Sequence, residues 1–233
     1  MELELSEDQE FFLATTRKFL AAEAPIPTVR ALEHVPAGFT ADYWRRGAEL
    51  GWTALLVPEA DGGGSIGDHG LLDLVLVAEE MGRRVAPGPL APVNLVAAAV
   101  AAHGSAEQRA AVLPGLLAGE AVAAWTGPAP VGAEADGDGF VLDGTAALVE
   151  AGAQADHLLV TARAGAGVTL LLVPIQTPGV TVTPLGGLDL VRRYAEVRCV
   201  GARVPAAAVV GAAGGAGAEV ERLAQVEIGR AHV

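Results

Sequence analysis

The spacing of apolar residues changes near Gly119, and this change constrains the fold more than any other feature of the sequence. Before Gly119, apolar side chains recur every three or four residues, whereas after it they form short, β-branched runs between turn dipeptides. Helices and strands are therefore predicted to form segregated blocks, a fold of the α+β class. We expect an N-terminal all-helical domain at 1–118, an antiparallel β-barrel-like domain at 119–211 and the start of a further helical domain at 212–226.

Capping residues mark where the helices are expected to begin. Ser6 with Gln9, and Ser105 with Gln108, are capping-box pairs, which satisfy free backbone N–H groups in the first turn of a helix. Helices are expected over 6–23, near 40–50, after Asp68, over PVNLVAAAVAAHG and over SAEQRAAVLPGLLAGE. The core-facing stripe of the third helix is expected to consist of Leu71, Leu72, Val75, Ala78 and Met81.

The charge of the chain excludes some partners. With 28 acidic and 15 basic residues, the formal net charge is −13, which disfavours nucleic acid and anionic lipid surfaces. The N-terminal MELELSEDQE lacks the positive region of a signal peptide, and the apolar run LVAAAVAA is too short to span a bilayer. We expect a cytoplasmic protein with no nucleic acid and no membrane partner.

Cys199 is the single cysteine, and its neighbours alternate between apolar and charged side chains. This alternation indicates a buried strand residue rather than a reactive thiol. The histidines have no second ligand three or four residues away, so no metal site is expected.

Gly62, Gly64 and Gly67 fit the G-x-G-x-x-G pattern of a dinucleotide-binding loop, and the apolar run TALLVP precedes them. The helix that follows, however, leads into GRRVAPGPLAP, which cannot be the second parallel strand that such a site requires. The three glycines are therefore interpreted as a flexible connection.

Six fragments, in this order along the chain, resemble the acyl-CoA dehydrogenase family of flavoproteins. They are LSEDQEFFLATTRKFLAAEA, WRRGAELGWTALLVPEADGG, LVAEEMGRRVAPGP, LPGLLAGEAVAAWTGP, DGFVLDGTAALVEAGAQAD and GARVPAAAVVG. The resemblance covers residues 1 to about 226 and implies a helical domain, a middle β-domain and a C-terminal four-helix bundle. Only the first turns of that bundle would lie in this chain.

The resemblance implies two functions of different classes. The first is FAD-dependent dehydrogenation of an acyl-CoA thioester to the trans-2-enoyl-CoA, in β-oxidation of fatty acids or steroid side chains. Its expected partners are the acyl-CoA, an electron-transfer flavoprotein or similar acceptor, and further subunits of a homo- or hetero-oligomer. The alternative is a flavin-poor, non-catalytic subunit of a hetero-oligomeric acyl-CoA dehydrogenase, because GLDLVRRYAEVRCVGARVP resembles family members built that way.

The resemblance places the flavin contacts at Ala124, Trp125, Thr126, Leu148, Val149 and Glu150. Thr126 keeps the family's hydroxyl, whose alternative role is that of a satisfied strand threonine. Leu148 stands where the family has an aromatic ring that stacks on the flavin, and Glu150 where it has a threonine that bonds the N5 edge. A carboxylate there would oppose the charge of the arriving hydride, so FAD binding is expected to be weak or absent, lowered by a factor of about 100 or more.

No catalytic residue is expected within this chain, because the family's glutamate base lies in the C-terminal bundle. Glu79 and Glu80, and likewise Glu219 and Glu221, are interpreted as solvated helix faces. The last residues, EIGRAHV (227–233), depart from the family pattern and can be encoded by DNA that resembles a sequencing adapter. We therefore expect a non-native tail, and a chain that has no dehydrogenase activity by itself.

Overall fold

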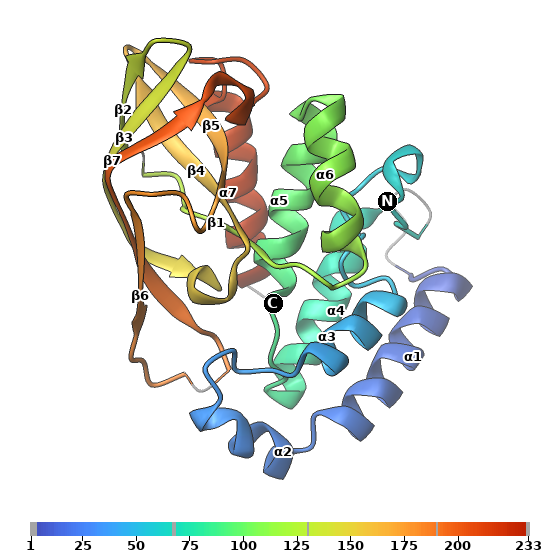
Figure 1. The fold of residues 1–233 in the computed structure, drawn as a ribbon. Coiled ribbons are helices and arrows are strands. Elements are labelled where there is room, and N and C mark those ends of the chain that lie inside the picture. The colour runs from blue at the N-terminus through green and yellow to red at the C-terminus, as the bar shows by residue number, and fades with distance from the viewer. Residues whose placement is uncertain (1–3, 67–68, 130, 190, 232–233) are drawn as a thin grey trace.

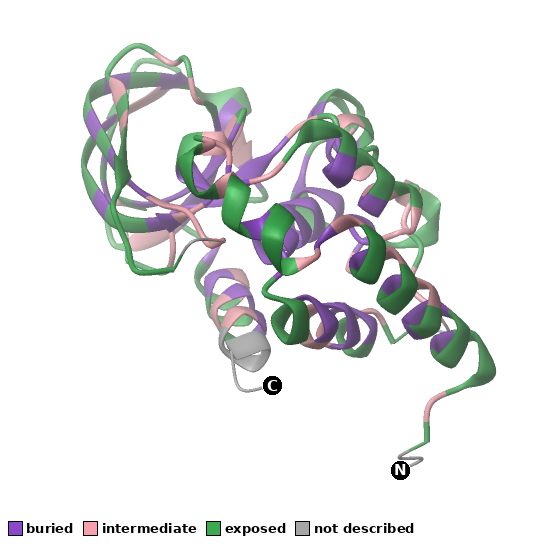
Figure 2. Ribbon diagram, turned by 90° about the horizontal axis from the view of Figure 1, so that it is seen from below, coloured by how far each residue is buried: buried purple, intermediate pink, exposed green. Residues whose placement is uncertain are grey.

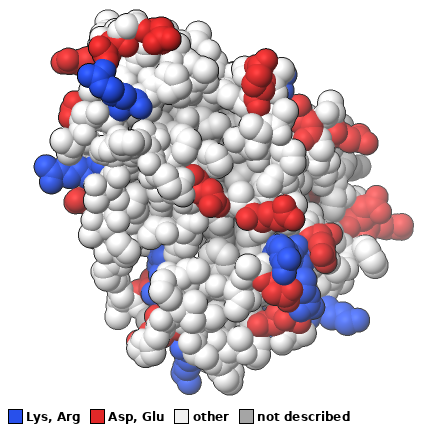
Figure 3. All heavy atoms as spheres, viewed as in Figure 1, with Lys and Arg blue, Asp and Glu red and all other residues white. Residues whose placement is uncertain are grey.

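The helices lie on one side of the molecule and a curled sheet on the other (Figure 1). The computed structural model describes residues 4–66, 69–129, 131–189 and 191–231. In the part of the chain so described, no helix is long and apolar enough to cross a membrane. On the face seen in Figure 3, charged side chains lie mostly over the helices and at the upper end of the sheet, with uncharged surface between them.

The helices begin where the capping residues predict. Ser6 and Ser105 both complete their capping boxes, and the Thr40 side chain accepts a hydrogen bond from the Tyr43 backbone N–H. A short helix that follows Pro25 was not expected from the sequence. The helices are α1 (Glu7–Glu23), α2 (Ile26–Ala31), α3 (Ala41–Glu49), α4 (Gly70–Arg84), α5 (Leu90–His103), α6 (Ala106–Leu117) and α7 (Gly217–Ala231).

The sheet has the strand order β6-β7-β3-β2-β4-β5-β8, with β1 paired to β4, and it curls around a buried interior (Figure 2). Its strands are β1 (Ala123–Trp125), β2 (Val131–Asp136), β3 (Gly139–Glu150), β4 (His157–Ala164), β5 (Gly167–Pro174), β6 (Val180–Leu185), β7 (Tyr194–Pro205) and β8 (Val209–Val210). Cys199 on β7 is buried, as its flanking alternation predicts.

The predicted antiparallel β-barrel-like domain also contains parallel pairings, which the sequence did not predict. Strand β4 runs parallel to both β1 and β2, although the other pairings are antiparallel. The reason is the hairpin of β2 and β3. Strand β3 ends beside the start of β2, so β4, which follows β3 and also pairs with β2, runs in the same direction as β2.

Helix α5 is buried on all sides from Leu90 to Ala101, and it contacts α6 and α7 as well as β1 and β8. The polar side chain in this stretch, Asn94, accepts a hydrogen bond from Leu55 N–H and donates to the carbonyls of Trp52 and Leu90. One continuous apolar core therefore reaches from the helices into the sheet. The predicted domain boundary near residue 118 does not coincide with a break in this core and stays a prediction.

The stripe expected to face the core on α4 is partly wrong. Leu71 and Leu72 are exposed, whereas the buried side includes Asp73 and Glu80. The two carboxylates are buried because they have partners, most of which come from other elements. Asp73 accepts hydrogen bonds from the Gln9 side chain and the Ile66 backbone N–H, and Glu80 pairs with Arg17 at 2.9 Å and with Arg83. Glu80 is thus not on a solvated face, whereas Met81 is buried as predicted.

Helix α7 packs against α4, α5 and β5, with Val220 and Leu223 buried as predicted and Ala224 half-buried. Glu221 is exposed as expected, but Glu219 is not on a solvated face, because it pairs with Arg222 and with His103 of α5. The expectation of a non-native tail stays a prediction; its last two residues, 232–233, lie outside the described residues.

The predicted flexible connection at the glycine pattern has no strand before it, since the residues of TALLVP form turns. Gly62 adopts φ 86° after a short 3₁₀ turn, and Gly67 and Asp68 lie outside the described residues. The strand–loop–helix unit of a dinucleotide site is therefore not built here.

Replacing Asn94 by alanine is expected to lower the free energy of unfolding by about 2–4 kcal/mol. The Leu55 N–H and the Trp52 carbonyl would lose their partner in the buried interior, and the Leu90 carbonyl would lose its side-chain bond. The matched control is Gln225→Ala on the exposed face of α7, which should cost at most about 0.5 kcal/mol. Urea unfolding curves of both variants measure the difference, and equal costs would contradict this role of Asn94.

The pair of Glu219 with Arg222 and His103 should make the anchoring of α7 depend on pH. Burial raises the pKa of Glu219, but hydrogen bonds and charges from Arg222 and His103 outweigh it and hold the pKa below its ordinary value. The stabilisation is therefore present above the unfolded pKa of about 4.3 and is lost as pH falls through the lower folded value. We expect Glu219→Gln to cost about 1 kcal/mol at neutral pH, and this cost should shrink steadily as the pH falls below the unfolded pKa, with Glu221→Gln as the control. A cost that does not shrink on acidification would contradict this.

Candidate functional site

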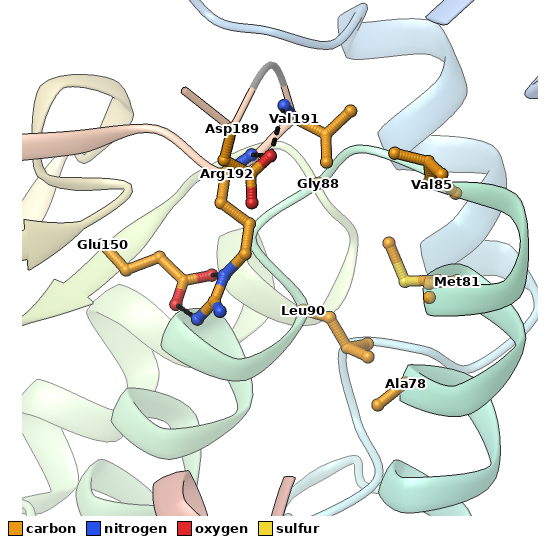
Figure 4. Close-up of a pocket in the computed structure, with 11 residues that line it drawn as sticks. Ala78, Met81, Val85, Gly88, Leu90, Glu150, Asp189, Val191 and Arg192 are labelled. Atoms are coloured by element: carbon orange, nitrogen blue, oxygen red, sulfur yellow. Dashed lines mark hydrogen bonds and ion pairs between the residues drawn. The ribbon is translucent and has the colours of Figure 1, made fainter. Parts of the chain in front are cut away.

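A cavity of about 340 Å3 opens between α4, the turn that leads into α5, and the segment before β7 (Figure 4). Two kinds of side chain face each other across it. The apolar wall is formed by Ala78, Met81, Val85, Ala86 and Leu90. The charged wall, on the sheet side, is formed by Glu150, Asp189 and Arg192. The cavity is thus apolar on the helical side and polar on the sheet side.

Positive backbone φ angles shape the turn that carries the apolar wall. Val85 ends α4 with φ 53°, and Gly88 has φ 129°, a conformation that side chains other than glycine rarely adopt. A Cβ at Gly88 would also lie 3.0 Å from ring carbons of Trp44. Glycine at this position therefore lets the turn pack on Trp44 and brings Leu90 to the cavity.

The centre of the charged wall is a two-point ion pair. Arg192 donates from Nε to Glu150 Oε1 at 3.3 Å and from Nη2 to Oε2 at 2.5 Å. The Glu150 side chain is only 9% exposed and that of Arg192 is 40% exposed. Burial lowers the pKa of Arg192, but the hydrogen bond and charge of Glu150 outweigh it and hold the pKa above its ordinary value. Both groups are therefore charged, and each neutralises the other.

Local contacts fix the position of Arg192. Asp189 Oδ1 accepts hydrogen bonds from the backbone N–H groups of Val191 and Arg192, which sets the turn before β7. The guanidinium carbon of Arg192 lies 5.6 Å from the centre of the Tyr194 ring, and Tyr194 is the register partner of Glu150. Strand pairing thus brings the two ends of the ion pair together although 42 residues separate them.

The next residue, Arg193, joins the helical half to the sheet beside the cavity. Its Nη2 donates to the carbonyls of Leu32 and Glu33, and Gln154 donates to the carbonyl of Ala37. These contacts hold the segment after α2 against the end of β3. The charged wall therefore lies next to a segment that hydrogen bonds hold to the helical half of the molecule.

Most of the predicted flavin contacts lie in the core. Ala124, Trp125, Thr126 and Val149 are all buried. The indole N–H of Trp125 donates to Thr161 Oγ1, and Thr126 Oγ1 accepts from the Thr161 backbone N–H. These bonds support the role of Thr126 as a satisfied strand threonine.

The two remaining predicted contacts reach the surface at the end of β3. Leu148 is 66% exposed and supplies no aromatic ring, while Glu150 is engaged by Arg192. Among the described side chains at these six positions, the aromatic ring of Trp125 and the hydroxyl of Thr126 are both buried, so neither is accessible to a flavin. The side chains do not fit the flavin contacts that the resemblance implies, so we derive no step through a flavin from them.

No pattern in the sequence predicts the cavity. Ala78 and Met81 fall in the predicted core stripe of α4, and Arg192 lies in a fragment that carries the family resemblance. The positive φ of Val85 has no signal in the sequence, whereas the Gly-Pro of VAPGPLAP was a turn signal that could have pointed to Gly88.

A known protein family matches the helical part of the chain, and individual proteins match a longer stretch. Residues 6–120 match the family described as "Acyl-CoA dehydrogenase, N-terminal domain". The human mitochondrial short-chain specific acyl-CoA dehydrogenase is 31% identical over 199 residues, which cover 77% of this chain and 47% of the human protein. The chain spans about half the length of the curated relatives it matches.

Two solved structures are similar over nearly the whole chain. The ChsE4-ChsE5 complex from Mycobacterium tuberculosis has a TM-score of 0.86 at 27% identity, covering 97% of this chain and 62% of that one. A variant of the Tcur3481-Tcur3483 steroid ACAD has a TM-score of 0.81 at 29% identity, covering 94% and 60%. The predicted order of a helical region followed by a sheet domain is confirmed.

The ion pair predicts a non-additive mutational response. Arg192→Met should cost about 2 kcal/mol of unfolding free energy, because it leaves the mostly buried Glu150 carboxylate without its main partner. Adding Glu150→Gln should recover at least half of this loss. The control is Arg203→Met in the exposed pair with Asp136, which should cost at most about 0.5 kcal/mol. Additive losses at positions 192 and 150 in thermal unfolding would contradict the coupling.

Proposed function

The chain belongs to the acyl-CoA dehydrogenase family, and we propose that its protein binds an acyl-CoA thioester and dehydrogenates it to the trans-2-enoyl-CoA with FAD. The observation that carries the proposal is the cavity between α4 and the end of β3. Its apolar wall suits an acyl group, and it adjoins the strand end where the family resemblance puts the flavin.

The proposal concerns the whole protein. The curated relatives that the chain matches are about twice as long as the chain itself. We assign no catalytic base to the described residues. Glu150 is the most buried carboxylate of the charged wall, but Arg192 engages both of its oxygens and stabilises its charged form, which makes it a weak base. We accordingly expect residues 1–233 alone to bind substrate without turning it over.

Cofactor and partners belong to the same proposal. FAD is the cofactor of the family chemistry, although the side chains at Leu148 and Glu150 predict that this chain holds it weakly or not at all. The proposed partners are an electron-transfer flavoprotein or similar acceptor and further subunits, either identical or different. The proposed substrate is a fatty acyl or steroid side-chain thioester in β-oxidation, and the proposed location is the cytoplasm.

Visible spectroscopy of the whole purified protein tests the reaction. With FAD added in excess, we expect flavin absorbance that bleaches when acyl-CoA is added without oxygen, with enoyl-CoA formed in equal amount. A protein that is colourless alone and becomes yellow and active only with a second subunit would instead support the flavin-poor subunit. Absence of acyl-CoA turnover in both preparations would contradict both functions.

A variant pair tests the assignment of the strand end. Leu148→Trp with Glu150→Thr should tighten FAD binding by about tenfold or more, because the stacking ring and the hydroxyl are both restored. Leu72→Trp, at an exposed leucine of α4, is the control and should leave FAD affinity unchanged. Fluorescence titration with FAD measures both, and equal affinities would contradict a flavin site at the end of β3.

A further inference from the structure

A second cavity, of about 130 Å3, lies in the helical half, where the end of α1 meets α2 and the start of α3 (Figure 1). We call it the α1–α3 cavity; it shares no lining residue with the cavity of Figure 4. One water molecule needs only about 10–15 Å3 of space, so a small organic ligand has room here. Part of its wall is apolar and buried, and this part includes Ala24, Val29 and Pro87.

Tyr43 lines the α1–α3 cavity, and its buried hydroxyl has no hydrogen-bond partner within the described residues. The residue is only 7% exposed, so bulk water does not replace the missing partner. Phe19 stacks on the ring with centroids 5.7 Å apart, and Trp52 meets it edge-on at 6.2 Å, which fixes the ring in place. A buried polar group without a partner is costly, and a ligand that bonds it would recover that cost.

Glu23 lies close enough to act on this hydroxyl. Burial, and after it the negative charge of Glu23, raise the pKa of Tyr43. The phenol is therefore neutral, and its oxygen can accept a hydrogen bond. Because Glu23 and Tyr43 both line the α1–α3 cavity, a ligand between them can bond to both.

The charged residues that line the α1–α3 cavity are all acidic. They are Glu23 and Asp42, and no described lining residue is a lysine, arginine or histidine. Arg46 pairs with Glu23 at 2.9 Å from outside the lining. Arg45 pairs with Asp42 in the same way, at 3.3 Å. A carboxylate has about four acceptor sites, so each of these pairs leaves capacity for a donor on the ligand.

The C-terminal end of α1 adds a partial negative charge at the same place. The last carbonyl groups of a helix lack partners within it, and a cation near them is favoured. The last turn of α1 contains no basic residue, and its C-cap, Ala24, lines the cavity. The positive end of α3 also reaches this space, but Thr40 caps it and Asp42 in its first turn balances it. The local field therefore favours a cation.

From this arrangement we propose that the α1–α3 cavity binds a small primary alkylammonium ion. An ammonium group has three donors and no acceptor, which matches the oxygens of Glu23, Tyr43 and Thr28. Its short alkyl chain lies against Ala24 and Val29. The net charge of −13 raises the concentration of such cations near the protein. The site does not depend on the proposed dehydrogenation.

Three ligands with the same four-carbon chain test the proposal by calorimetric titration of the purified protein. They are butylammonium, 1-butanol and butyrate, in an amine-free buffer with about 0.15 M sodium chloride to screen attraction to the net charge. One butylammonium ion per chain should bind at least about tenfold more tightly than butanol, and butyrate should not bind. Equal affinities for butylammonium and butanol, binding of butyrate, or no binding by any of the three would each overturn the proposal.

A tyrosine pair assigns the binding to the unpartnered hydroxyl. Tyr43→Phe removes only this group and should weaken butylammonium binding by about threefold to tenfold. Its thermal unfolding midpoint should not fall, since the hydroxyl has no partner to lose. Tyr194→Phe, at the other tyrosine of the chain, is the control and should change the affinity by less than about twofold. Equal affinities of the two variants would overturn the proposal.

A glutamate pair separates the local charge from the net charge. Glu23→Gln should weaken butylammonium binding by at least about tenfold. Glu10→Gln, at an exposed position in the first turn of α1, removes the same charge from the molecule and should change the affinity by less than about twofold. Equal losses in the two variants would mean that butylammonium only follows the net charge, and this would overturn the proposal.

Discussion

Burial of α5 on all sides is the constraint on which the other features of the molecule depend. Because Leu90–Ala101 exposes almost no surface, other elements must cover this helix on every side, and those that contact it include α6, α7, β1 and β8. The turn that enters α5 is consequently held close to the end of β3. The cavity lies between this turn, α4 and the end of β3. Its apolar wall is therefore part of the same packing that holds the helices to the sheet.

Pairing of Glu150 with Arg192 changes how the strand end is understood. The sequence suggested an unbalanced carboxylate where the family bonds the N5 edge of the flavin. In the structure the charge is balanced by a guanidinium that the turn at Asp189 and the Tyr194 ring hold in place. The obstacle to a flavin at β3 is therefore the missing ring and hydroxyl more than the charge, and Arg192 is available to interact with a ligand in the cavity.

Local signals in the sequence predicted most of the fold. Capping boxes at Ser6 and Ser105 give the starts of two helices, and alternation around Cys199 gives a buried strand, because these patterns depend on near neighbours. The buried side of α4 could not be predicted, because the partners of Asp73 and Glu80 come from elsewhere in the fold. Likewise, the ion pair of the site depends on strand register between distant segments, which no local pattern contains.

The central claim is that the cavity between α4 and the end of β3 is the acyl site. A crystal structure of the protein with a non-reacting acyl-CoA thioether tests this claim most directly. The account predicts that the acyl group lies between Met81 and Leu90 on one side and Arg192 on the other, with the Glu150–Arg192 pair intact. Density for the acyl group elsewhere on the molecule, with this cavity filled only by water, would contradict it.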